Sequence, residues 1–145
     1  MLFSILLGCG RNVKFDVGFA IDGSNSIDDN EYRQTKDFVK DVIKAFSIAE
    51  NGTHVALLQY ATKGIIKLYF DDDLFNPKDL LDEVEQIENT NGGSTNIREG
   101  LATTLKMFST RNGMRGDDVS IRFINNSSVS SVDYTEEKLN DDGQS

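Results

Sequence analysis

The feature that most limits the fold of this chain is the order of three segments. A nearly unbroken apolar run is followed by a stretch with helical spacing and then by a second apolar run. Residues 15–21 have the composition of a strand that is buried on both faces. Between Asp29 and Ile48 the apolar side chains recur at helical intervals, and residues 54–61 form the second apolar run. Two buried strands joined by a helix run parallel in one sheet, with the helix packed on a face of that sheet. The pattern therefore predicts an α/β fold.

The remaining segments extend this pattern. Residues 64–70 follow the second strand closely enough for a hairpin. Further helices are expected around Pro77, after Gly93 and at 132–142, with a fourth strand at 119–124. In the helix after Gly93, the positions expected to face the sheet are the apolar ones: Ile97, Leu101, Leu105 and Phe108. The sequence predicts a doubly wound, mostly parallel sheet with helices on both faces and one antiparallel hairpin strand at an edge.

Length and charge narrow the function. The chain has 145 residues, enough for one domain with a core, and 24 acidic against 15 basic residues give a net charge of −9. This charge argues against binding to nucleic acid or to an anionic membrane. No segment approaches the roughly 20 apolar residues of a transmembrane helix, so membrane insertion is not expected. The apolar run at 2–7 is either the remnant of a signal segment or a buried leading segment, which sets residues 1–10 apart from a domain at 13–145.

Oxygen-bearing side chains follow the first strand and recur later in the chain. Asp22, Ser24 and Ser26 come directly after the first apolar run, Thr95 follows a glycine pair, and Asn126 follows the fourth strand. Ligands of open parallel sheets bind at the carboxyl ends of the strands, where these side chains are expected. Carboxylate and hydroxyl oxygens are hard donors that suit Mg²⁺, Mn²⁺ or Ca²⁺. The alternative for the group around Thr95 is that one of its polar residues only caps the following helix.

These motifs, Asp22-Gly-Ser24-Asn-Ser26 after a strand and Gly-Gly-Ser-Thr95 before a helix, resemble those of the von Willebrand factor A-type domain. The resemblance covers about residues 9–143, and integrin inserted domains, matrilins and many collagens carry this domain. It implies a metal-ion-dependent adhesion site in which Ser24, Ser26 and Thr95 contact the cation, with Asp22 close by, often through water. A carboxylate of a protein partner then completes the coordination. The implied function is extracellular adhesion through Mg²⁺, or through Mn²⁺ or Ca²⁺.

Three features depart from the family pattern. The family has an aspartate where this chain has Asn126, so the site has one carboxylate instead of two and its cation affinity should be low. Ser120 and Arg122 interrupt a strand that is expected to be apolar throughout. The family would also begin a fifth strand after Gly143, so the C-terminal part of the domain is expected to be missing. The alternative function is a degenerate or truncated fold that binds proteins without metal.

Signals for catalysis are weak in this sequence. A phosphatase of the haloacid dehalogenase type needs a second aspartate two residues after Asp22, where this chain has Ser24. No phosphate-binding P-loop sequence occurs. The one histidine, His54, opens a strand and is expected to be solvated, which argues against a Ser-His-Asp site. We therefore expect a binding protein and not an enzyme.

Two short motifs have both a functional and an ordinary interpretation. Arg115-Gly116-Asp117 spells the integrin-recognition tripeptide, but glycine and charged residues are also what a turn before a strand contains, and we expect only a turn. Asn51 begins a glycosylation triplet in an expected exposed turn, which is compatible with an extracellular location.

Overall fold

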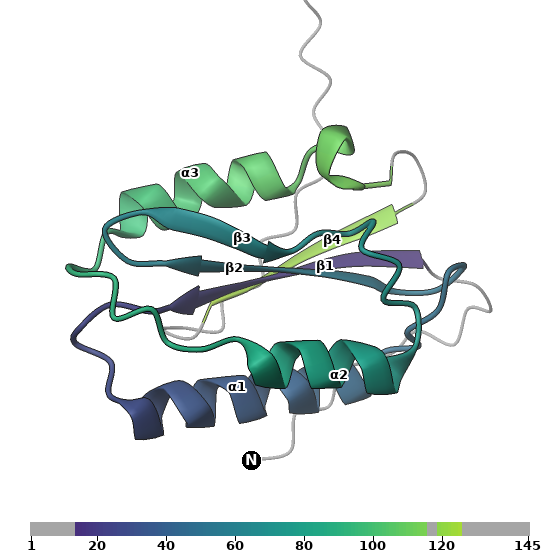
Figure 1. Ribbon diagram of the computed structural model, residues 1–145. Coiled ribbons are helices and arrows are strands. Elements are labelled where there is room, and N and C mark those ends of the chain that lie inside the picture. The colour runs from purple at the N-terminus through teal and green to yellow at the C-terminus, as the bar shows by residue number, and fades with distance from the viewer. Residues whose placement is uncertain (1–13, 116–118, 126–145) are drawn as a thin grey trace, which may run out of the picture.

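A computed structural model describes the backbone of residues 14–115 and 119–125, and the side chains of residues 14–115. Four strands form one sheet in the order β3-β2-β1-β4: β1 (Lys14–Asp22), β2 (His54–Tyr60), β3 (Gly64–Leu68) and β4 (Val119–Asn125). β1 runs parallel to β2 and to β4, and β3 pairs antiparallel with β2 (Figure 1). The predicted mostly parallel sheet with an antiparallel hairpin strand at one edge is confirmed.

Helices cover both faces of this sheet (Figure 1). α1 (Asp29–Lys44) and α2 (Pro77–Gln86) pack on one face, and α3 (Ile97–Met107) lies on the other. A single 3₁₀ turn at Thr110–Asn112 follows α3. The larger cluster of buried side chains fills the space between the sheet and the α1–α2 layer, and a smaller cluster lies under α3. Within the described part of the chain, no helix is both long and apolar enough to span a bilayer.

α1 begins as predicted but ends earlier. Asp28 caps its first turn, and the Glu31 side chain returns a hydrogen bond to the Asp28 backbone, which completes a capping box. The helix stops at Lys44, four residues before the predicted end at Ile48. Ile48 is buried, as its apolar character requires, but it forms an isolated bridge with Thr53. The apolar spacing therefore continues beyond the helix itself.

The face of α3 that meets the sheet was predicted wrongly. Three of the four expected residues are 58%, 55% and 73% exposed: Ile97, Leu101 and Leu105. Phe108 does pack against the cluster under α3. The buried side of the helix carries Gly100, Thr103 and Met107. Glycine is needed at position 100 because α3 lies very close to β2 there: a Cβ atom at Gly100 would come within 2.9 Å of the Tyr60 ring.

The prediction that His54 is solvated is also wrong. His54 is only 9% exposed, and its Nε2 lies 2.9 Å from the carbonyl oxygen of Glu50. The imidazole packs against Phe75, with ring centroids 4.5 Å apart, so the segment before α2 covers the start of β2. Asn51, in the turn before β2, is exposed as expected.

Arg115 is tied to a buried carboxylate at the amino end of β1. Its Nε donates to Oδ1 of Asp16 at 2.8 Å, and its backbone N–H donates to Oδ2 at 2.7 Å. Its Nη2 also donates to the carbonyl oxygen of Phe15 at 2.6 Å. Arg115 therefore has a structural role.

Several predictions fall outside the described residues. They concern the leading segment at 1–10, the tripeptide residues Gly116 and Asp117, the site residue Asn126 and the helix at 132–142. β4 forms as a strand parallel to β1, but the side chains of Ser120 and Arg122 are outside the described set.

Candidate cation site

Four of the five predicted site residues, Asp22, Ser24, Ser26 and Thr95, lie together at the carboxyl edge of β1 and β2, the left edge in Figure 1. Asp22 is the last residue of β1, and its Oδ1 accepts a hydrogen bond from the Ser24 backbone N–H at 2.9 Å. This bond folds the loop at 23–28 back over the end of the strand. Asp22 is only 9% exposed and Ser24 is fully buried, whereas Ser26 and Thr95 are exposed. The group therefore extends from a buried base to an accessible rim.

Three hydroxyl oxygens lie within hydrogen-bond distance of one another. Ser24 Oγ is 2.8 Å from Ser26 Oγ and 2.8 Å from Thr95 Oγ1. The third side of this triangle, from Ser26 Oγ to Thr95 Oγ1, is 3.3 Å. We call these three groups the hydroxyl triad. Ser24 and Thr95 are 71 positions apart in sequence, so the fold and not the local motif brings them together.

Backbone hydrogen bonds hold the two loops of the site against each other. Gly92 N donates to the Gly23 carbonyl at 3.0 Å, and Asn25 N donates to the Gly93 carbonyl at 2.9 Å. The Asn25 side chain accepts a further bond from Gly93 N at 3.2 Å. Glycine is required at both positions of the pair, since Gly93 has a φ of 95° and a Cβ at Gly92 would lie 2.9 Å from the Ala61 side chain. The Gly-Gly sequence therefore serves the close approach of the loops.

The triad has the dimensions of one face of a small octahedral site. Mg²⁺ binds oxygen at 2.0–2.1 Å, so adjacent ligands of its octahedron are about 2.9 Å apart. Ca²⁺ binds at 2.3–2.6 Å, which separates adjacent ligands by about 3.5 Å. Two triad distances of 2.8 Å and one of 3.3 Å fit the smaller ion better. The residues present therefore fit Mg²⁺ or an ion of similar size.

The structure decides between the two interpretations of the residues before α3. Asn96 is the helix cap, because its Oδ1 accepts a hydrogen bond from Glu99 N at 3.2 Å. The Ser94 hydroxyl lies 3.4 Å from the Thr62 hydroxyl. Capping thus falls to Asn96, and the Thr95 hydroxyl belongs to the triad.

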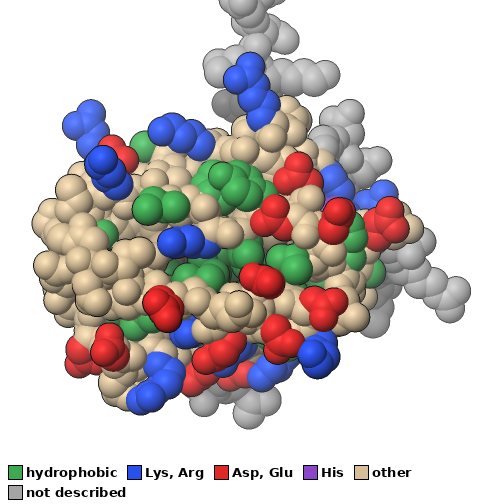
Figure 2. All heavy atoms as spheres, viewed as in Figure 1, with side chains coloured by type: hydrophobic (Ala, Val, Ile, Leu, Met, Phe, Trp, Pro, Cys, Tyr) green, Lys and Arg blue, Asp and Glu red, His purple; other side chains and the backbone are tan. Residues whose placement is uncertain are grey.

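The charge of the site is low. Among the residues that the structure describes, no three His, Cys, Asp or Glu side chains gather into a metal-binding group, and Asp22 is the one acidic residue in the set of Asp22, Ser24, Ser26 and Thr95. In Figure 2 the carboxyl edge, on the left, is made mostly of uncharged polar side chains and backbone. β4 ends at Asn125, and Asn126 follows it outside the described residues.

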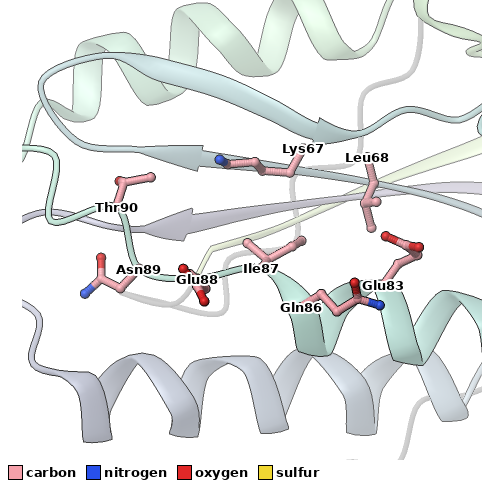
Figure 3. A pocket seen from close by; sticks show the side chains of 8 residues that line it. All are labelled: Lys67, Leu68, Glu83, Gln86, Ile87, Glu88, Asn89 and Thr90. Carbon is pink, nitrogen blue, oxygen red and sulfur yellow. The ribbon is translucent and has the colours of Figure 1, made fainter.

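A separate groove lies away from the hydroxyl triad. It has a volume of about 420 Å³ and runs between β3 and the C-terminal end of α2 (Figure 3). Lys67, Glu83 and Glu88 are among its lining residues, and none of the triad residues takes part. The groove is therefore separate from the cation site. It is shallow and open, and does not resemble a small-molecule pocket.

Sequence reasoning missed the residues that support the triad from below. Gln59 in β2 is 2% exposed and touches the loop at Gly23, and Asn25 links the two loops through Gly93. A signal for Gln59 was available, because it is a polar residue in the middle of a buried apolar strand. Nothing in the sequence indicates the pairing of Asn25 with a loop 68 positions away.

Comparison with known proteins finds a matching family model and relatives of similar sequence. A family model for the von Willebrand factor type A domain matches residues 16–138. Human collagen alpha-6(VI) chain is 36% identical over 107 residues, which cover 74% of this chain and 5% of that protein. Mouse vitrin is 36% identical over 110 residues, 72% of this chain and 16% of vitrin. The chain therefore spans only a small part of the length of these relatives.

A solved structure shares the fold. Proximal thread matrix protein 1 from the mussel byssus, solved with a zinc-occupied MIDAS motif, superposes with a TM-score of 0.71 at 24% identity. The match covers 79% of this chain and 31% of the mussel protein.

Proposed function

The chain belongs to the von Willebrand factor type A family, and on that basis we propose that it is a cation-dependent adhesion module. It binds an acidic residue of a protein partner through a divalent cation, Mg²⁺ or Mn²⁺ in preference to Ca²⁺. Ser24, Ser26 and Thr95 hold the cation, Asp22 lies beside it, and Asn126 contributes an amide oxygen. The observation that carries the proposal is the hydroxyl triad, in which two of the three oxygen–oxygen distances, both 2.8 Å, are close to the ligand spacing of a magnesium octahedron, and the third is 3.3 Å.

Each described residue has a defined task in this proposal. Ser24 forms the buried base of the triad, and Ser26 and Thr95 present their hydroxyls at the accessible rim. Asp22 supplies negative charge, and its hydrogen bond from Ser24 N fixes the orientation of the carboxylate. When bound, the cation supplies a positive charge and a coordination position for the carboxylate of the partner. These tasks describe a binding role.

The proposed affinity for the cation is low. Asp22 is the one acidic group among the described site residues, and Asn126 brings no charge where the family has an aspartate. Mg²⁺ loses its water reluctantly, so a site with fewer charges holds it less tightly. The collagen relatives support an extracellular matrix setting, where the acidic partner would be a matrix or cell-surface protein.

A second candidate function is a protein-binding module that works without metal. The specific observation in its favour is that the three hydroxyls already satisfy one another by hydrogen bonds at 2.8–3.3 Å. These hydrogen bonds link the two loops of the site through protein groups alone.

Titration calorimetry with Mn²⁺ and Mg²⁺ separates the two functions. We expect weak binding by the unaltered chain and a loss of about tenfold or more in Ser24→Ala and Thr95→Ala. Thr35→Ala is the matched control, because it removes a hydroxyl that bonds only to the Glu31 carbonyl in α1. Binding that is equal in all four proteins, or absent from a folded unaltered chain, would favour the metal-free function.

A further inference from the structure

A single buried amide lies beneath both loops of the cation site. Gln59 in β2 is 2% exposed, and its side chain occupies the space next to Gly23. A Cβ atom at Gly23 would come within 2.4 Å of Gln59 Nε2 and 2.7 Å of its Cγ. The loop that carries Ser24 and Ser26 therefore rests directly on this side chain, and glycine is needed for that contact.

The same amide reaches the second loop. Gln59 Nε2 donates to the hydroxyl of Tyr32 in α1 at 2.9 Å and to the carbonyl oxygen of Glu88 at 3.2 Å. Glu88 stands at the start of the segment that leads to Thr95, and the Tyr32 hydroxyl donates to the same carbonyl at 3.4 Å. Gln59 thus contacts the first loop by packing and the second loop by a hydrogen bond.

An apolar side chain would suit this place in the sheet better if packing were the only requirement. The neighbours of Gln59 along β2 are Leu58 and Tyr60, both buried. The Oε1 atom of Gln59 is buried and has no hydrogen-bond partner among the described residues, and such a group is costly to bury. The amide donates two hydrogen bonds, one to the Tyr32 hydroxyl in α1 and one to the Glu88 carbonyl in the segment that leads to Thr95, and the second of these ties β2 to a loop of the site.

We infer that Gln59 is a positioning residue that sets the separation of the two loops and thereby the preference of the site for Mg²⁺ over Ca²⁺. This inference rests on the proposed cation-dependent function. The two triad distances that cross between the loops, 2.8 and 3.3 Å, depend on how closely the loops approach. When the Glu88 carbonyl loses its bond to Gln59, the loops can separate toward the wider spacing that Ca²⁺ accepts.

The test compares Gln59→Leu with the unaltered chain by Mg²⁺ and Ca²⁺ calorimetry. Leucine keeps the side-chain bulk and removes the amide. We expect Mg²⁺ affinity to fall by about tenfold while Ca²⁺ affinity changes by less than about threefold, so the ratio of the two shifts toward calcium. Thr103→Val is the control, since it removes a buried polar group from α3, on the other face of the sheet, and should leave the ratio unchanged.

A second measurement does not depend on metal. Amide hydrogen exchange at Gly92 and Asn25, whose N–H groups bridge the loops, should speed up in metal-free Gln59→Leu and not in Thr103→Val. Equal losses of Mg²⁺ and Ca²⁺ affinity, or unchanged exchange at these amides, would reduce Gln59 to a general packing residue and overturn the inference. If the unaltered chain binds neither ion, the proposed function fails, and unchanged selectivity in a chain that does bind them refutes only the role of Gln59.

Discussion

Removing the Arg115 side chain should destabilise the protein far more than removing a surface charge. Asp16 is completely buried, and its carboxylate accepts Nε and the backbone N–H of Arg115 while Nη2 lies 2.7 Å from Oδ1. Arg115→Leu deletes the side-chain donors and keeps the backbone donor. Breaking a buried pair in this way costs about 3–5 kcal/mol, and we expect the lower end, about 3 kcal/mol, because one donor remains.

Urea unfolding followed by circular dichroism measures this loss. With a slope of about 2 kcal/mol per molar urea, 3 kcal/mol lowers the midpoint by about 1.5 M. Lys44→Met is the control, since it breaks an exposed pair with Asp41 and should change stability by less than about 0.5 kcal/mol. Asp16→Leu combined with Arg115→Leu should regain much of the loss, because no buried charge is left unpaired. A midpoint for Arg115→Leu that matches the Lys44→Met control would refute the reasoning.

Three further predictions concern stability and pH. Met107→Ala, at a fully buried position, should lower the free energy of unfolding in urea by about 2–4 kcal/mol. Leu105→Ala, at a position on the same helix that is 73% exposed, should lower it by less than about 0.5 kcal/mol, and similar losses in the two variants would contradict the observed face of α3. Burial raises the pKa of Tyr32 from 10.0 to about 12. The phenol therefore ionises at lower pH in the unfolded chain than in the folded one, so the free energy of unfolding should fall as pH rises from 10 to about 12. Urea unfolding of the unaltered chain and of Tyr32→Phe across this pH range should show a smaller fall in the variant. Asp28→Ala should cost about 1 kcal/mol through loss of the α1 cap, and an unchanged melting temperature would argue against the capping box.

The central strands β1 and β2 were predictable because they are buried on both faces. Continuous apolar character at 15–21 and 54–61 has few explanations other than parallel strands, and the position of Asp22 after the first run follows from it. Which face of α3 packs against the sheet was not predictable from the spacing of its apolar residues. Its buried side carries Gly100, where the close approach to Tyr60 of β2 leaves no room for a side chain, and Thr103, which lies against Gly64 of β3.

The residues of the site were predictable from the sequence, but the contacts around them were not. Residue types and their places after strands indicated the group of Asp22, Ser24, Ser26 and Thr95, and the structure brings the three hydroxyls of this group within 3.3 Å of one another. The role of Asn96 as the cap depends on a backbone geometry that the sequence does not specify. The contacts of Gln59 depend on a register, Ile21 opposite Gln59, that no local pattern contains.

A Mg²⁺ titration of the unaltered chain beside Asn126→Asp would test the cation site most directly. If Asp22, Ser24, Ser26 and Thr95 form a site that lacks only a second charge, the unaltered chain should bind weakly and the variant about tenfold tighter or better. Two proteins that are folded by circular dichroism and equally unable to bind Mg²⁺ would contradict the proposed site.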